Sequence, residues 1–134
     1  MDKQFWISAL VMFLATLVVG FVVHASLLGA DYAALPNLYR SEEDSANYFQ
    51  YMLLAHVLMG IGLTWVYRMG RDDSAWLGQG LRFGAALIVL ITIPTYMIFY
   101  AVQPMPAVLA VKQILFDSVG MLLIGMLAAY VNRS

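Results

Sequence analysis

Six side chains that could take part in proton transfer or ligand binding lie within the long apolar stretches of this 134-residue sequence: His24, His56, Tyr96, Tyr100, Gln113 and Asp117. An ionisable group in an apolar environment is costly unless it is paired, so such groups mark a hydrogen-bonded cluster or a functional site. Counting helical rise from the nearest polar segment places His56 about 13 Å deep, Asp117 about 16 Å deep and Tyr96 about 9 Å deep. His24 is expected to be shallower. We therefore predict one polar cluster in the outer half of a helical bundle.

The simplest interpretation of these side chains is structural. We expect Asp117 to form a hydrogen bond with His56 or with Tyr96, because polar residues hold apolar helices together where water is absent. The alternatives are functional. His24 and His56 could bind haem b through their imidazole nitrogens, and the same histidines with Asp117 and a methionine could bind copper or zinc. His56, Asp117 and Tyr96 could instead line a proton path or bind a quinone.

The sequence offers little other chemistry. It has no cysteine and no motif typical of a serine nucleophile, a phosphate-binding loop or a zinc protease. Two histidines are too few for a two-haem cytochrome, and the nine methionines lack the clustered spacing of a copper relay, which favours a role as core filler. We therefore predict no catalytic residue, no metal site and no cofactor unless the histidines bind haem b.

The composition favours a protein surrounded by lipid. Hydrophobic residues make up 63% of the chain and charged residues only 11%, whereas about a quarter of the residues of a soluble domain are charged. A core this small cannot bury so much apolar surface. The net charge of −1 argues against a nucleic-acid partner, which requires a basic face.

Four apolar segments are long enough to cross a bilayer, at approximately residues 5–28, 42–69, 75–102 and 106–132. Short connections make consecutive helices antiparallel. We therefore predict a single all-α domain over residues 1–134, an integral membrane four-helix bundle of up-down-up-down topology. The first segment has an alternative interpretation as a cleaved signal peptide, but its apolar run is long for one.

Capping residues, a proline and stripes of small and polar residues predict details within these four segments. Ser41 is expected to cap the second helix, which starts with three acids, and Asp73 or Ser74 is expected to cap the third. Pro94 removes a backbone donor and should kink the third helix. Stripes of small and polar residues at helical spacing should face inward, namely Thr16-Gly20-His24, Met52-His56-Gly60-Thr64, Thr92-Tyr96-Tyr100 and Gln113-Asp117-Gly120. Gly80 and Gly84, four residues apart, indicate a close helix contact.

The distribution of basic residues predicts the orientation. With both termini in the cytoplasm, five basic residues lie on the inner side and two on the outer side, which agrees with the positive-inside rule. The inner residues are Lys3, Arg68, Arg71, Arg82 and Arg133, and the outer residues are Arg40 and Lys112. The three tryptophans then lie at the inner interface, where indole rings are favoured.

Two stretches of the chain resemble the DUF1761-type small four-helix bacterial membrane proteins. The first is Gly20–Gly29, GFVVHASLLG, at the end of the first segment. The second is Tyr100–Gly125, YAVQPMPAVLAVKQILFDSVGMLLIG, in which a proline turn precedes a helix with one acid. The order and lengths of the four segments are also similar. The resemblance implies a four-helix fold in a family of unknown function, so it assigns no functional residue.

These observations favour an accessory or structural subunit of a larger bacterial inner-membrane complex, respiratory or photosynthetic, with the bilayer and other membrane subunits or further copies of the chain as partners. An alternative is a redox or ligand-binding membrane protein that uses His56, Asp117 and His24 to bind haem b, a quinone or a metal. A small oligomeric transporter is a second alternative. A lipid-modifying enzyme is less favoured, because no nucleophile–base pair is evident.

Overall fold

The computed structural model describes residues 1–133, and these are helical with no strand. Four helical stretches are long and apolar enough to cross a membrane, at Lys3–Leu27, Phe49–Gly70, Trp76–Val102 and Ala107–Val131. This confirms an all-helical fold with four membrane-length helices. The elements in chain order are α1 (Lys3–Gly20), η1 (Phe21–Leu27), α2 (Gly29–Ala33), α3 (Glu42–Ala46), α4 (Phe49–Gly70), α5 (Trp76–Leu87), η2 (Ile88–Thr92), α6 (Ile93–Val102) and α7 (Ala107–Val131).

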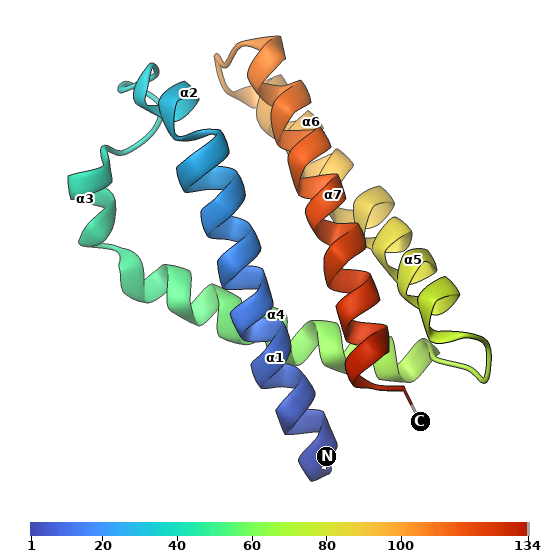
Figure 1. The fold of residues 1–134 in the computed structure, drawn as a ribbon. Helices are drawn as coiled ribbons and strands as arrows, with labels where there is room; N and C mark the ends of the chain where they lie inside the picture. The colour runs from blue at the N-terminus through green and yellow to red at the C-terminus, as the bar shows by residue number, and fades with distance from the viewer. Residues whose placement is uncertain (134) are drawn as a thin grey trace.

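The long helices form two closely packed pairs, α1 with α4 and α5 with α7 (Figure 1). Glycines make both contacts possible. A Cβ atom at Gly60 would lie 2.5 Å from the Ala9 carbonyl oxygen, and one at Gly125 would lie 2.4 Å from the Gly80 carbonyl oxygen. A Cβ atom at Gly84 would meet the backbone of α7 at 2.8 Å. The close contact predicted from Gly80 and Gly84 is therefore confirmed.

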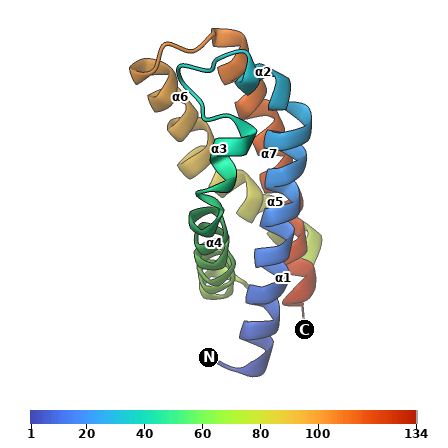
Figure 2. The ribbon, with the colours of Figure 1, turned by 90° about the vertical axis from the view of Figure 1, so that its left-hand side faces the viewer.

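Helix α4 crosses the other long helices instead of lying alongside them. In Figure 1 it runs across the molecule, and in Figure 2, turned by 90°, it is seen almost along its axis. Gly60 is buried at the crossing and Thr64 is buried beyond it. In the half of α4 before the crossing, most side chains are exposed. Met52, which was expected to face inward, is 52% exposed, whereas His56, one helical turn further on, is buried against α1.

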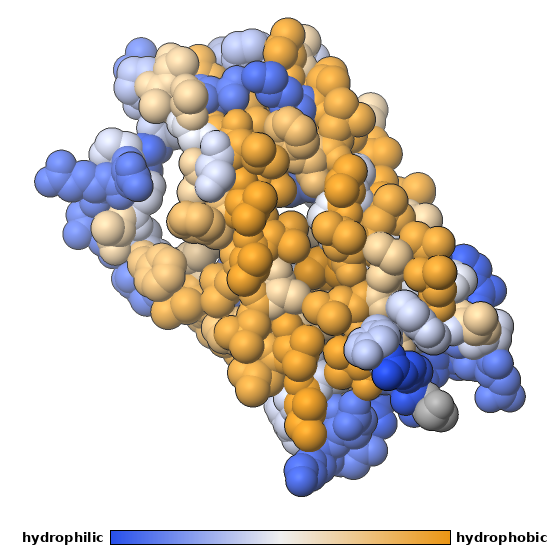
Figure 3. All heavy atoms as spheres, viewed as in Figure 1, coloured by the Kyte–Doolittle hydropathy of each residue, from blue (hydrophilic) through white to orange (hydrophobic). Residues whose placement is uncertain are grey.

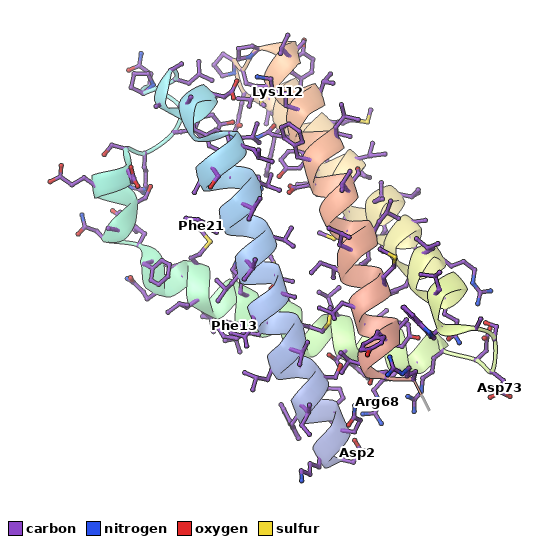
Figure 4. All side chains as sticks on the ribbon, in the orientation of Figure 1. Asp2, Phe13, Phe21, Arg68, Asp73 and Lys112 are labelled. Carbon is purple, nitrogen blue, oxygen red and sulfur yellow. The ribbon has the colours of Figure 1, made fainter. Side chains whose placement is uncertain are left out.

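Polar contacts join the two pairs at the end that carries Asp2 and Arg68 (Figure 4). Asn132 Nδ2 donates to Ser8 Oγ at 2.8 Å, and Ser8 Oγ lies 3.1 Å from Thr64 Oγ1. Arg71 Nη1 donates to the Asn132 carbonyl at 3.0 Å. Figure 3 shows hydrophilic residues at the two ends of the molecule and hydrophobic residues between them.

Two local expectations differ from the structure. The helix expected over 42–69 is two helices, because the turn at Asn47 and Tyr48 is closed by i to i−3 hydrogen bonds and the chain changes direction there. Ser41 does cap the first of them, accepting from Asp44 N at 3.1 Å. The expected cap of α5 is wrong, since the N-cap residue is Ala75 and no side chain caps the helix start. The Gln79 side chain instead ties the preceding turn to α5, accepting from Asp72 N at 3.0 Å.

Two membrane-length helices contain wide π-helical turns, η1 at the end of the first and η2 within the third. η2 ends two residues before Pro94, where the missing N–H already interrupts the helical hydrogen bonds. Such turns change which side chains face a given direction and often accompany functional sites. η1 contains His24 and η2 precedes Tyr96, and both turns set the geometry described next.

Candidate functional site

Four elements bring five polar side chains together at the end of the molecule that carries Lys112 (Figure 4): His24 from η1, Tyr32 from α2, Tyr96 from α6, and Gln113 and Asp117 from α7. We call this set the His24 cluster. Gln113 and Asp117 are one helical turn apart, so they share a face of α7. The cluster joins the α1–α4 pair to the α5–α7 pair.

The hydrogen bonds of the His24 cluster form one directed chain. Asp117 can only accept, so His24 Nε2 donates to Asp117 Oδ2 at 3.2 Å, and the Tyr96 hydroxyl donates to the same oxygen. His24 Nδ1 then accepts from the Tyr32 hydroxyl at 2.6 Å, and Gln113 Nε2 donates to Tyr32 at 3.3 Å.

Burial keeps the Tyr32 hydroxyl protonated. Because the ring is removed from water, the pKa of Tyr32 is raised to about 12, although the bond from Gln113 opposes the shift. The hydroxyl therefore retains the proton that it donates to His24. The Tyr32 ring also stacks beside the His24 imidazole, with centroids 5.9 Å apart and planes 17° apart.

An apolar cap covers the His24 cluster at this end of the molecule. Val23, Leu28, Met105, Leu109 and Ala110 are buried together, and the loop residues Leu35, Leu38 and Tyr39 pack against them. The side chains of His24 and Asp117 nevertheless remain 36% and 16% exposed.

Two acceptors of the cluster have no donor among residues 1–133. Both hydrogen bonds to Asp117 use Oδ2, which leaves Oδ1 without a partner. Gln113 is only 4% exposed, yet its Oε1 accepts no hydrogen bond. Buried polar atoms are nearly always paired, so an orphan of this kind calls for an explanation.

The structure separates the residues that the sequence grouped. It brings His24, Tyr96, Gln113 and Asp117 together, but His56 lies elsewhere and Tyr100 is 48% exposed. The Asp117–Tyr96 bond was one of the two expected. In place of the other, Asp117 bonds to His24, because α4 turns away from α7 and carries His56 to α1.

The contacts of His56 are separate from those of the His24 cluster. Its Nδ1 lies 2.9 Å from Thr16 Oγ1, and the Thr16 hydroxyl donates to the Phe13 carbonyl at 3.0 Å. The ring rests against Gly20, where an added Cβ would lie 3.5 Å away. This buried pair fixes α4 against α1.

Ligation of a metal or haem would disturb this arrangement. Both ring nitrogens of His24 are already bonded, to Tyr32 and to Asp117, so an iron ligand at His24 would have to break one of these bonds. Among residues 1–133, no three His, Asp or Glu side chains are close enough together to hold a metal ion.

Sequence reasoning missed Tyr32. It lies between the first two predicted membrane segments, where the short helix α2 turns its hydroxyl onto His24. Asp31, its neighbour, accepts from Lys112 Nζ at 3.0 Å and holds α2 against α7. The sequence contains no periodic pattern over Gly29–Ala33 that would have indicated this helix.

Comparisons with protein-family models, curated proteins and solved structures found no match. They do not bear on the resemblance to the DUF1761-type proteins, which stays a prediction. The functional argument therefore depends on the geometry of the chain itself.

Proposed function

We propose that the protein spans the bacterial inner membrane four times, in an up-down-up-down arrangement with both termini in the cytoplasm. The positive-inside rule supports this orientation. The contacts of Asp2 with Arg68 and of Arg71 with Asn132 are consistent with it, since they join residues near both chain ends to the more basic loop. The pair of Asp31 and Lys112 lies at the opposite end of the molecule.

Within that membrane, we propose that the protein is an accessory subunit that binds a larger membrane protein along the first half of α4. The observation that carries this proposal is an apolar face in that half which no other helix among residues 1–133 covers, where Phe49, Tyr51, Met52, Leu54 and Leu58 are all more than half exposed. Helix association in lipid depends on close packing. A membrane-length helix packed over only half its length has the other half available for a partner.

Co-purification with a matched pair of variants tests this role. Tagged protein is extracted from its native membrane in a mild detergent, and co-purifying membrane proteins are quantified. Leu58→Trp enlarges the proposed contact face, and Leu90→Trp makes the same change on η2, where the side chain is also exposed. We expect Leu58→Trp to lose the partner and Leu90→Trp to retain it. An isolated wild-type protein, or equal loss in both variants, would refute the role.

A second candidate function is the binding of an amphiphilic molecule at the His24 cluster. It is favoured by the convergence of five polar side chains from four elements, with unpaired Asp117 Oδ1 and Gln113 Oε1 beneath an apolar cap. Intramembrane ionisable residues commonly mark substrate or proton sites.

Mass spectrometry of co-purified lipophilic molecules tests the second candidate. We expect a molecule retained by wild-type protein and by His56→Gln, but lost from Asp117→Asn. His56→Gln is the control because it alters an intramembrane polar residue outside the cluster. Identical extracts from all three proteins would contradict ligand binding at this site.

A further inference from the structure

An open cavity of about 200 Å³ lies where α4 ends and α5 begins. Figure 4 labels Asp73 in the turn between these helices, at the opposite end of the molecule from Lys112 and the His24 cluster. Five polar side chains line the cavity, and they are Tyr67, Arg71, Asp72, Gln79 and Arg82. A molecule that binds in the cavity must match the hydrogen-bonding groups and the charge of these side chains.

The two arginines of the cavity have hydrogen-bond donors to spare. Arg71 Nη1 donates to the Asn132 carbonyl at 3.0 Å. Arg82 Nη2 lies 3.3 Å from Asp72 Oδ2 and 3.1 Å from Ser74 Oγ. A guanidinium group has five N–H donors, and within residues 1–133 neither arginine donates through Nε or through its second Nη. These N–H groups are available to a ligand.

The side-chain acceptors of the cavity are already engaged. Asp72 Oδ1 accepts from the backbone N–H and the hydroxyl of Ser74, and Asp72 Oδ2 accepts from Arg82. Gln79 Oε1 accepts from Asp72 N at 3.0 Å. The Tyr67 hydroxyl reaches the same oxygen only at 3.5 Å, the long limit of a hydrogen bond, although the Tyr67 side chain is 95% buried. The cavity therefore favours a ligand that accepts hydrogen bonds.

The charge of the cavity favours an anion. Its lining residues include two arginines and one aspartate, so they carry a net charge of +1. Arg82 is paired with Asp72, whereas Arg71 contacts no carboxylate within residues 1–133. A phosphodiester carries a single negative charge and would balance the net charge of these groups. The planar guanidinium group also matches the oxygens of a phosphate with two parallel hydrogen bonds.

The position of the cavity indicates the remainder of the ligand. It lies between the end of one membrane-length helix at Gly70 and the start of the next at Trp76. Trp65 and Trp76 lie near the same two helix ends, and tryptophan is favoured at the boundary between lipid and water. Val66, which is 54% exposed, and Phe83 form an apolar wall. A ligand with a phosphate at this boundary and an apolar chain below it fits both parts.

We propose that this cavity binds the head group of an anionic phospholipid. The phosphodiester accepts from the free N–H groups of Arg71 and Arg82 and from the Tyr67 hydroxyl, while an acyl chain lies along Val66 and Phe83. A zwitterionic phospholipid binds less tightly, because its ammonium group adds a positive charge beside the arginines. This site is separate from both candidate functions above. It requires only that the helices cross a membrane, in either orientation.

Lipids that share their acyl chains but differ in head group test the proposal. Purified protein in detergent is titrated with dioleoyl phosphatidylglycerol, phosphatidylcholine or phosphatidylethanolamine, and bound lipid is quantified by native mass spectrometry. We expect phosphatidylglycerol to bind at least tenfold more tightly than either of the others, a difference of about 1.4 kcal/mol. Equal binding of the three lipids overturns the proposal. Glycerophosphoglycerol, the same phosphodiester without acyl chains, tests the source of the phosphate. If it binds as tightly as the lipid, the site takes a soluble phosphodiester and the lipid assignment falls.

Variants locate the bound lipid. Arg71→Gln and Arg82→Gln each remove one positive charge from the cavity, and each should weaken phosphatidylglycerol binding about fivefold while phosphatidylcholine binding is unchanged. Lys3→Gln removes one positive charge at the same end of the molecule but outside the cavity, and it should bind as wild type does. Unchanged binding in both arginine variants, or equal weakening by Lys3→Gln, refutes the site.

A thermal midpoint for each variant separates lost binding from lost folding. Arg82→Gln also removes the bonds to Asp72 and Ser74 within the turn, so its midpoint is expected to fall. Arg71→Gln leaves those bonds in place and decides the outcome if Arg82→Gln does not fold. An Arg71→Gln protein with the wild-type midpoint and wild-type phosphatidylglycerol binding then refutes the proposal.

Discussion

Replacing Gly125 with alanine should push the α5–α7 pair apart. The new Cβ would lie 2.4 Å from the Gly80 carbonyl oxygen, 2.6 Å from Gly84 N and 2.8 Å from Gly84 Cα. All three are backbone atoms, which no side-chain rotation can move. The first separation is 0.6 Å below the 3.0 Å that real Cβ contacts respect. A gap of this size forfeits a quarter to a half of each dispersion contact along the seam, so we expect a loss of about 1–3 kcal/mol.

Gly62 provides the matched control, because a Cβ there meets nothing within 4 Å. Gly62→Ala should be neutral or stabilising by up to about 1 kcal/mol, since alanine is the better helix former. Stability is measured by chemical or thermal unfolding in detergent. Trp76 reports on the seam directly, because its ring packs edge-on against Tyr130 of α7 with centroids 5.3 Å apart.

In a protein whose only tryptophan is Trp76, Gly125→Ala should shift the fluorescence emission and Gly62→Ala should not. Equal unfolding midpoints and identical emission for the two variants would refute the claim that backbone contact at glycine holds α5 to α7.

Three further outcomes are expected. Tyr32→Phe leaves His24 Nδ1 and Gln113 Nε2 without their partner. The free energy of unfolding should fall by about 1–3 kcal/mol. Tyr39→Phe, which removes the hydroxyl of the neighbouring tyrosine, should lower it by less. Thr64→Val removes the buried Ser8–Thr64 bond and should lower the same quantity by about 1 kcal/mol. The hydrogen bonds from Arg68 and from the Phe5 N–H hold the pKa of Asp2 well below its usual range. The stabilisation that Asp2 provides is therefore present above about pH 3.9 and is lost as the pH falls through the lowered pKa. Asp2→Asn should remove that pH dependence, as measured by the difference in unfolding midpoint from wild type between neutral and acid pH.

The number and approximate positions of the four membrane-length helices could be predicted because they follow from apolar runs alone. The Gly80–Gly84 contact was also predictable, since two glycines one turn apart leave a strip of bare backbone. Ser41 was identified as a cap because a serine before three acids satisfies the free N–H groups of a helix start. Each of these features depends on a few neighbouring residues.

The membership of the polar cluster could not be predicted, because it depends on how helices cross. Counting residues from the polar ends assumes parallel helices and placed His56 beside Asp117. The contact of Gly60 with the backbone at Ala9 fixes a crossing of α1 and α4 that takes His56 to Thr16 instead. The π-helical turn around His24 and the short helix that carries Tyr32 likewise have no periodic signature.

The division of the long helices into two pairs has a consequence for biogenesis. The first and second membrane-length helices pack on each other, as do the third and fourth, so each hairpin can complete its own glycine seam as it leaves the ribosome. The polar turn between Gly70 and Trp76 is all that connects the hairpins covalently. A gene severed at that turn and expressed as two halves should therefore yield fragments that insert separately and then reunite.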